Sequence, residues 1–234
     1  MSDFSVAQYE ELIAKIHHTI EEVTRDFNNG MRRAENDSSS IPLVGNYIRD
    51  LIKKAQNLFD EAMAELNKFL EVSDVPPQLW KFGNSWNSIA TEVSDCAIQL
   101  HRVQQYSGGW KGIAGGKYKN AVSGQEPAAD VIKTRADSIS NACDSMANNG
   151  FNAYMAMGVA LVGLVGAFIS TGTGPGAIVG YAVGLTAFLA ALAYATHTLT
   201  IGLGTNIRSL EQVNQPSDVF TGESWPQSWP SATS

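Results

Sequence analysis

Three long stripes of apolar residues, spaced three and four positions apart, run through the first half of the chain. This spacing places apolar side chains on one face of an α-helix, so we expect amphipathic helices over about residues 3–36, 43–72 and 77–106. Polar and proline-rich breakers separate them, and no segment shows the alternation of a strand. The pattern predicts an all-α protein in which these helices pack as an antiparallel bundle.

A glycine-rich break follows the third of these helices, over residues 107–126. A fourth helix begins at Pro127 at the latest and extends into the 140s. Alternatively, it begins near Gly112 and is interrupted at Ser123-Gly124. In either case its apolar positions recur at helical spacing and predict one buried side.

The second half of the chain contains a stretch without any Asp, Glu, Lys or Arg, which spans 63 residues between Asp144 and Arg208. It holds two apolar runs, residues 151–169 and 177–201, separated by a turn cluster around Pro175. At about 1.5 Å per residue, helices of these lengths span roughly 28 and 37 Å, which brackets the ~30 Å hydrocarbon core of a bilayer. We therefore expect a hydrophobic helical hairpin.

Small residues recur in this hairpin at the four-residue spacing that lets membrane helices approach closely. Gly176, Gly180 and Gly184 follow this spacing in the second run, as do Gly163 and Ala167 in the first. Two interpretations stay open. The hairpin inserts into a membrane in at least one state, including a soluble form that later releases it, or it is the permanently buried core of a soluble bundle.

Composition and the scatter of reactive residues exclude several functions. The net charge is −7, whereas proteins that bind nucleic acid present a basic face, so we expect no nucleic-acid partner. The four histidines are scattered, and Cys96 and Cys143 lie outside zinc-motif spacing. We therefore expect no enzyme, no catalytic residues, no cofactor and no metal site. The two cysteines are either buried free thiols or, with a suitable helix stagger, a disulfide.

The most informative motif is Trp110-Lys111-Gly112, inside the glycine-rich break. Its glycine permits a left-handed backbone, and its indole can fold back on the facing helices. Followed by Ala114, Lys117 and Tyr118, it resembles the Trp-X-Gly turn of type VII (ESX-type) secretion substrates, over roughly residues 77–150. The resemblance implies a long helical hairpin joined by this turn, and a face that pairs with a helical partner.

The chain departs from this family at the export signal. That signal is often Tyr-X-X-X-Asp/Glu, but here the residue four positions after each tyrosine is never acidic. Export by this route then depends on a partner that carries the signal. The N-terminus lacks the basic start of a secretory signal peptide, which agrees with a route of this kind.

By composition the chain has three segments: an amphipathic bundle with the Trp-X-Gly turn over residues 1–150, the hydrophobic hairpin over 151–204, and a polar, flexible tail over 205–234. The favoured function is a non-enzymatic exported protein, secreted or bound to the cell envelope, whose hairpin acts on membrane lipid. Its protein partner is a helical secretion partner or a second copy of the chain. The alternatives are a pore-forming toxin component that stores its hairpin in a soluble bundle, and a soluble structural adaptor.

Overall fold

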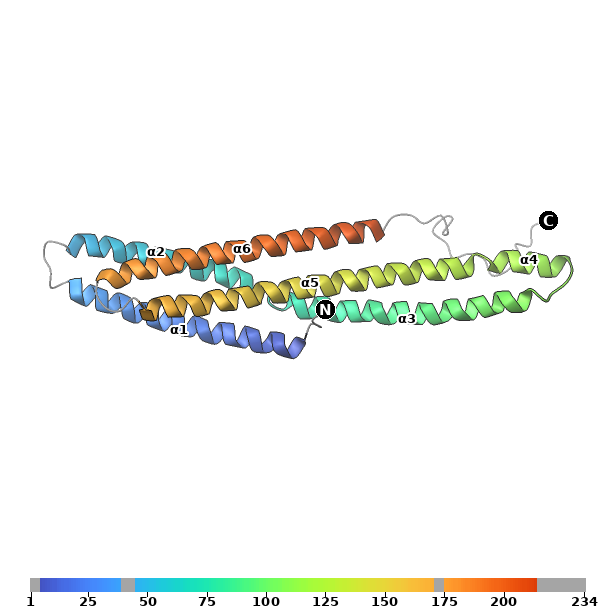
Figure 1. Ribbon diagram of the computed structural model, residues 1–234, viewed down its shortest axis with the longest axis horizontal. Coiled ribbons are helices and arrows are strands. Elements are labelled where there is room, and N and C mark those ends of the chain that lie inside the picture. The colour runs from blue at the N-terminus through green and yellow to red at the C-terminus, as the bar shows by residue number, and fades with distance from the viewer. Residues whose placement is uncertain (1–4, 39–44, 171–174, 214–234) are drawn as a thin grey trace. The chain divides into compact units, whose positions relative to one another are not determined.

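The structure is a computed structural model that describes residues 5–38, 45–170 and 175–213. Within these ranges the chain is helical and forms no strand (Figure 1), so the all-α prediction is confirmed. Its helices are α1 (Val6–Ser38), α2 (Gly45–Leu70), α3 (Val75–Ser107), α4 (Ile113–Val122), α5 (Gln125–Ser170) and α6 (Pro175–Val213).

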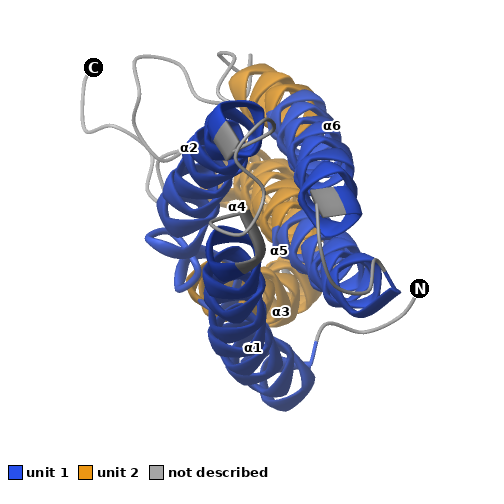
Figure 2. Ribbon diagram, turned by 90° about the vertical axis from the view of Figure 1, so that its left-hand side faces the viewer, with its two compact units in different colours: residues 1–77, 147–203 blue, residues 78–146, 204–234 orange. Residues whose placement is uncertain are grey.

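Contacts divide the chain into two compact units, which Figure 2 colours separately. Unit 1 contains residues 1–77 and 147–203, and unit 2 contains residues 78–146 and 204–234. Unit 1 therefore holds α1, α2, the end of α5 and most of α6. Contacts thus group the uncharged hairpin with the first two helices, whereas composition separates it from them.

Aromatic side chains from four helices meet at one end of unit 1. Phe27 of α1 stacks on Phe59 of α2 with ring centroids 4.1 Å apart. Phe27 also approaches Phe168 of α5 and Tyr181 of α6, at 5.9 and 6.1 Å. Phe168 and Tyr181 meet edge to face at 4.6 Å. Edge-to-face and offset contacts of this kind add to the free energy of burial, so this cluster ties both hairpin helices to α1 and α2.

Two buried tyrosines join the same helices elsewhere in unit 1. The hydroxyl of Tyr9 in α1 donates to the carbonyl of Ser73 at 2.6 Å, and that of Tyr154 in α5 donates to the carbonyl of Phe69 at 2.6 Å. The two tyrosine rings meet edge to face at 5.5 Å. Both hydroxyls thus have acceptors inside the unit, as buried polar groups require.

Unit 2 is packed through small side chains. A Cβ atom at Gly83 of α3 would lie 3.1 Å from the Cβ of Cys143 and 2.9 Å from Oδ1 of Asp144 in α5, so the two helices approach closely there. Both cysteines are free, with Cys143 buried and Cys96 exposed. The expectation of two buried thiols is therefore wrong for Cys96, which lies on the solvent side of α3.

Three helix boundaries differ from the favoured sequence interpretation. The earlier start of the fourth helix is confirmed, because α4 begins at Ile113 and a turn at residues 123–124 separates it from α5. The fourth helix and the first apolar run are one continuous helix, α5, since Gly150 costs a helix interior only about 1 kcal/mol. Helix α6 continues through residues 205–213, which composition assigns to the tail; the rest of the tail lies outside the described residues.

Candidate functional site

The Trp-X-Gly turn connects α3 to α4 within unit 2. Gly112 precedes the first residue of α4 with φ 97° and ψ 176°, a backbone region that residues with a Cβ rarely adopt. Open space surrounds the position, because a Cβ there would meet no atom within 4 Å. The backbone conformation, rather than crowding, therefore requires glycine at this position.

The structure brings the three motif residues together. The indole of Trp110 stacks on the ring of Tyr118 in α4, with centroids 5.3 Å apart and an interplanar angle of 27°. The indole folds onto the next helix and stays 63% exposed. Sequence reasoning missed Gly115, where a Cβ would lie 2.9 Å from the carbonyl oxygen of Trp110. The two adjacent glycines at positions 115 and 116 were the sequence feature that could have indicated this close approach.

Polar contacts hold α3 against α4 and α5 below the turn. His101 Nδ1 lies 3.0 Å from Glu126 Oε1 and its Nε2 lies 2.8 Å from Gln105 Nε2, while Gln104 donates to the Val122 carbonyl at 3.2 Å. His101 of α3 contacts the start of α5, whereas Gln104, which comes later in α3, contacts the earlier residue Val122 at the end of α4. Helix α3 and the α4–α5 segment therefore run antiparallel on either side of the Trp-X-Gly turn. This agrees with the hairpin that the Trp-X-Gly resemblance implies.

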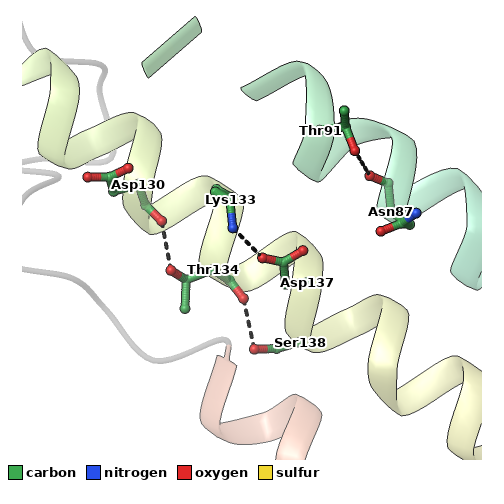
Figure 3. Close-up of polar contacts among 7 residues, drawn as sticks. All are labelled: Asn87, Thr91, Asp130, Lys133, Thr134, Asp137 and Ser138. Atoms are coloured by element: carbon green, nitrogen blue, oxygen red, sulfur yellow. Dashed lines mark hydrogen bonds and ion pairs between the residues drawn. The ribbon is translucent and has the colours of Figure 1, made fainter. Parts of the chain in front are cut away.

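Several other polar side chains of unit 2 bond within their own helix (Figure 3). Thr91 donates to the Asn87 carbonyl at 3.0 Å, and Thr134 donates to the Asp130 carbonyl at 2.8 Å. Lys133 pairs with Asp137 one turn away, at 2.8 Å. Across the described ranges, no three His, Cys, Asp or Glu side chains gather in a way that could hold a metal ion. These contacts stabilise helices and assemble no reactive group.

The uncharged hairpin forms the second candidate site. Gly184 of α6 lies against α5, because a Cβ there would be 3.1 Å from the Cβ of Ala167. Near the other end, a Cβ at Gly202 would be 2.7 Å from Nδ2 of Asn149. Helices α5 and α6 therefore run antiparallel along this length. Their two stretches, which end at Ser170 and begin at Gly176, are long and apolar enough to cross a bilayer, judged by length and composition only.

One face of this hairpin is covered by α1 and α2 of the same unit, and the other is open. About a third of the most apolar window of each helix is buried. The buried side chains face α1 and α2, whereas the open face carries large apolar side chains and no charge. Its exposed large apolar residues are Met155, Val159, Val162, Ile169, Val179, Val183, Tyr194 and Ile201.

The predicted glycines of the hairpin lie in different surroundings. Gly163 is exposed, with no atom within 4 Å of a built Cβ, and the same holds for Gly176. Gly180 is half-buried, and Gly184 faces α5 as described above. Pro175 is the first residue of α6. Of these residues, Gly184 closely approaches the facing helix, whereas Gly163 and Gly176 border open space.

The serine and threonine hydroxyls described in the hairpin helices donate to backbone carbonyls of their own helices. Each threonine of α6 up to residue 204 donates to the carbonyl four residues earlier, at 2.8 to 2.9 Å: Thr186, Thr196, Thr198 and Thr200. Ser170 of α5 donates to the carbonyl of Ala167 at 3.1 Å. Hydroxyls bonded in this way leave no unmet donor when a helix enters lipid. The open face is therefore chemically suited to an apolar surrounding.

A shallow apolar pocket of about 250 Å³ lies along the edge of the covered face, between α1 and α5. Leu12 and Ile16 line it from α1, and Met155, Val159 and Val162 line it from α5. It marks the edge at which the cover that α1 provides over the hairpin ends.

Comparison with known protein families shows which family the chain resembles. A family model described as a WXG100 like domain matches residues 73–197, more than half of the chain. The match contains the Trp110 turn and extends beyond the predicted 77–150 into both hairpin helices. No match was found among curated proteins or among solved structures.

Proposed function

Because the chain belongs to the WXG100-like family, we propose that it is a non-enzymatic protein, exported by type VII secretion, whose uncharged hairpin acts on a membrane. The family makes it a type VII secretion-related helical protein. Its destination is the exterior or the cell envelope. Action on lipid is the further step, and it rests on the properties of α5 and α6.

The observation that carries the proposal is the one-sided cover of the hairpin. Apolar side chains such as Val159 and Val183 stand on its open face, although a soluble protein gains free energy by hiding such residues. In lipid the same side chains are solvated by acyl chains. Contact with lipid also explains why the hairpin has no charged residues, because an Asp or Lys at the centre of a bilayer costs about 2.5–3.5 kcal/mol.

The length of the hairpin fits this function. From Ser170 back to Asn152, helix α5 rises about 27 Å, close to the ~30 Å of a hydrocarbon core. The exposed polar and aromatic groups Tyr194 and His197 lie toward the corresponding end of α6. Tyrosine and histidine suit the interface between lipid and water. The hairpin would then enter the bilayer with the C-terminal end of α5 and the N-terminal end of α6 first.

Export is proposed to require a helical partner. The tyrosine-based signal is absent from the chain, and proteins of this family typically pair as helical dimers. A partner that binds along the Trp110 hairpin would supply the signal. A second copy of the chain could not, because it lacks the same motif.

Flotation with neutral vesicles tests the action on lipid. Val159, near the centre of the first apolar run and 70% exposed, is replaced by Asp in the full-length chain. Since the site is open, the fold should change by no more than about 0.5 kcal/mol. Buried charge in lipid should weaken binding to phosphatidylcholine vesicles by about 100-fold, as 2.5–3.5 kcal/mol requires.

Val72→Asp is the matched control, since Val72 is exposed on unit 1 outside the hairpin. It should float like the unchanged chain. If Val159→Asp also floats normally, or if the unchanged chain does not bind vesicles, the hairpin does not enter lipid. The soluble adaptor is then the correct interpretation.

A pore-forming component is the second candidate, favoured by the aromatic cluster around Phe27 and Tyr181. This cluster stores one face of the hairpin against α1 and α2, as in a soluble form that opens at a membrane. Release of a trapped dye from vesicles distinguishes the two candidates. Dye release that Val159→Asp abolishes supports a pore, whereas tight binding to vesicles that stay sealed contradicts it.

A further inference from the structure

A cluster of positive charge surrounds the Trp-X-Gly turn in an acidic protein. Residues 96–125 contain four basic residues and no Asp or Glu, although the net charge of the chain is −7. The four are Arg102, Lys111, Lys117 and Lys119, and all are exposed. Local potential depends on nearby charges rather than on the total, because exposed charges are screened beyond about 10 Å. The turn is therefore a basic surface.

Acidic side chains of unit 2 do not neutralise this surface. In the described part of the chain, none of the four basic residues forms an ion pair. The acidic residue that follows in the sequence, Glu126, is held by His101 at 3.0 Å. The four cations thus remain available for an external anion.

Apolar and aromatic side chains stand among these cations. Tyr106 is 80% exposed, Trp110 is 63% exposed and Ile113 is 83% exposed. A side chain that is exposed to this extent has no walls around it, so these residues do not line a groove for a peptide. An extended surface needs no such walls to contact exposed side chains.

We propose that this basic aromatic tip, residues 102–119, docks the protein on an anionic lipid surface. Lys and Arg near such a surface contribute about 1 kcal/mol each, and Trp and Tyr rings settle at the level of the lipid headgroups. Stacking of Trp110 on Tyr118 and the fixed backbone at Gly112 hold the ring in place before contact. This docking uses unit 2 and no residue of the hairpin, so it stands or fails independently of the proposed function.

The test is flotation of the full-length chain with two kinds of vesicle, phosphatidylcholine alone and phosphatidylcholine mixed with phosphatidylserine. The variant Lys117→Gln with Lys119→Gln removes two exposed cations without touching the Trp110 stack. Binding to the phosphatidylserine vesicles at low salt should fall by about 30-fold, the equivalent of about 1 kcal/mol for each charge. Added salt should remove most of the difference.

The matched control is Lys53→Gln with Lys54→Gln, which removes two adjacent exposed cations from α2 in unit 1. It should bind both kinds of vesicle like the unchanged chain. Equal losses in the two double variants would mean that net charge alone acts, and the proposal would be wrong. Binding that does not increase with phosphatidylserine would also overturn it.

Two further results separate the possible ligands and sites. If soluble poly-glutamate binds the tip and phosphatidylserine vesicles do not, the ligand is an acidic protein segment and the lipid proposal is wrong. Val159→Asp, which prevents insertion of the hairpin into lipid, should not change the salt-sensitive binding to phosphatidylserine vesicles that depends on Lys117 and Lys119. Loss of that binding in Val159→Asp would show that the tip does not dock by itself.

Discussion

Replacing Gly30 of α1 by alanine should destabilise the protein, although alanine is the better helix former. A Cβ at position 30 would lie 2.6 Å from Cζ of Tyr181 in α6 and closer still to the ring atom Cε2 and to the hydroxyl oxygen of the same side chain. Contacts this short do not occur, so the ring must move. Its movement is opposed by Phe168, 4.6 Å away edge to face, and by Phe27 at 6.1 Å.

The expected size follows from two opposing effects. Exchange of glycine for alanine inside a helix gains about 1 kcal/mol, and overpacking a core costs about 1–3 kcal/mol, occasionally more. Gly163 is the control, because a Cβ there meets no atom within 4 Å and only the gain remains. The gain is common to both variants, so Gly30→Ala should be less stable than Gly163→Ala by the overpacking cost alone, about 1–3 kcal/mol.

Thermal unfolding followed by helical circular dichroism measures this difference. For a chain of this size, 1 kcal/mol shifts Tm by about 2–4 °C, so the Tm of Gly30→Ala should lie roughly 2–12 °C below that of Gly163→Ala. In a Tyr181→Leu background the penalty of Gly30→Ala should shrink, since the ring that it meets is gone. Equal or higher Tm for Gly30→Ala would refute the close contact between α1 and α6.

Two other predictions concern the reactivity of the two thiols and the ionisation of a buried tyrosine. Cys96 is exposed and should react at once with a thiol reagent. Cys143 should react only after unfolding, because it is buried and burial, as the main cause, raises the pKa of its thiol. Equal reaction rates of the two thiols would contradict this packing. Burial also raises the pKa of Tyr9 well above its ordinary value of about 10. Because the folded state keeps this proton, stability is full below pH ~10 and falls above it by up to ~1.4 kcal/mol per pH unit. The urea midpoint should therefore drop between about pH 9 and pH 11, and Tyr9→Phe should flatten the drop; an unchanged slope would contradict it.

Local patterns in the sequence were sufficient for the elements and for the turn. Apolar spacing placed α1, α2 and α3 within a few residues, because a helix with one buried face repeats every 3.6 residues. The turn at Gly112 was also visible, since a glycine beside a tryptophan between two helical patterns is a short-range signal. The end of α6 could not be predicted in this way, because residues 205–213 are polar and are helical as the continuation of a long helix.

Contacts between distant residues decided the rest. A glycine inside a helix lowers its stability, and only the position of Tyr181 explains why residue 30 of α1 is glycine. The open face of the hairpin around Val159 likewise depends on where α1 and α2 end their cover, which apolar composition does not encode.

Taken by itself, the sequence determined that the chain is helical, that it carries an uncharged hairpin of bilayer length, and that a tryptophan–glycine turn joins two of its helices. These are properties of neighbours along the chain, and helix formation and charge content are local. Tertiary structure alone decided which side of the hairpin is hidden, which thiol is reachable, and that the aromatic rings of Tyr106 and Trp110 stay exposed. Burial is a property of residues that meet across the fold, and many different packings are compatible with one pattern of helices.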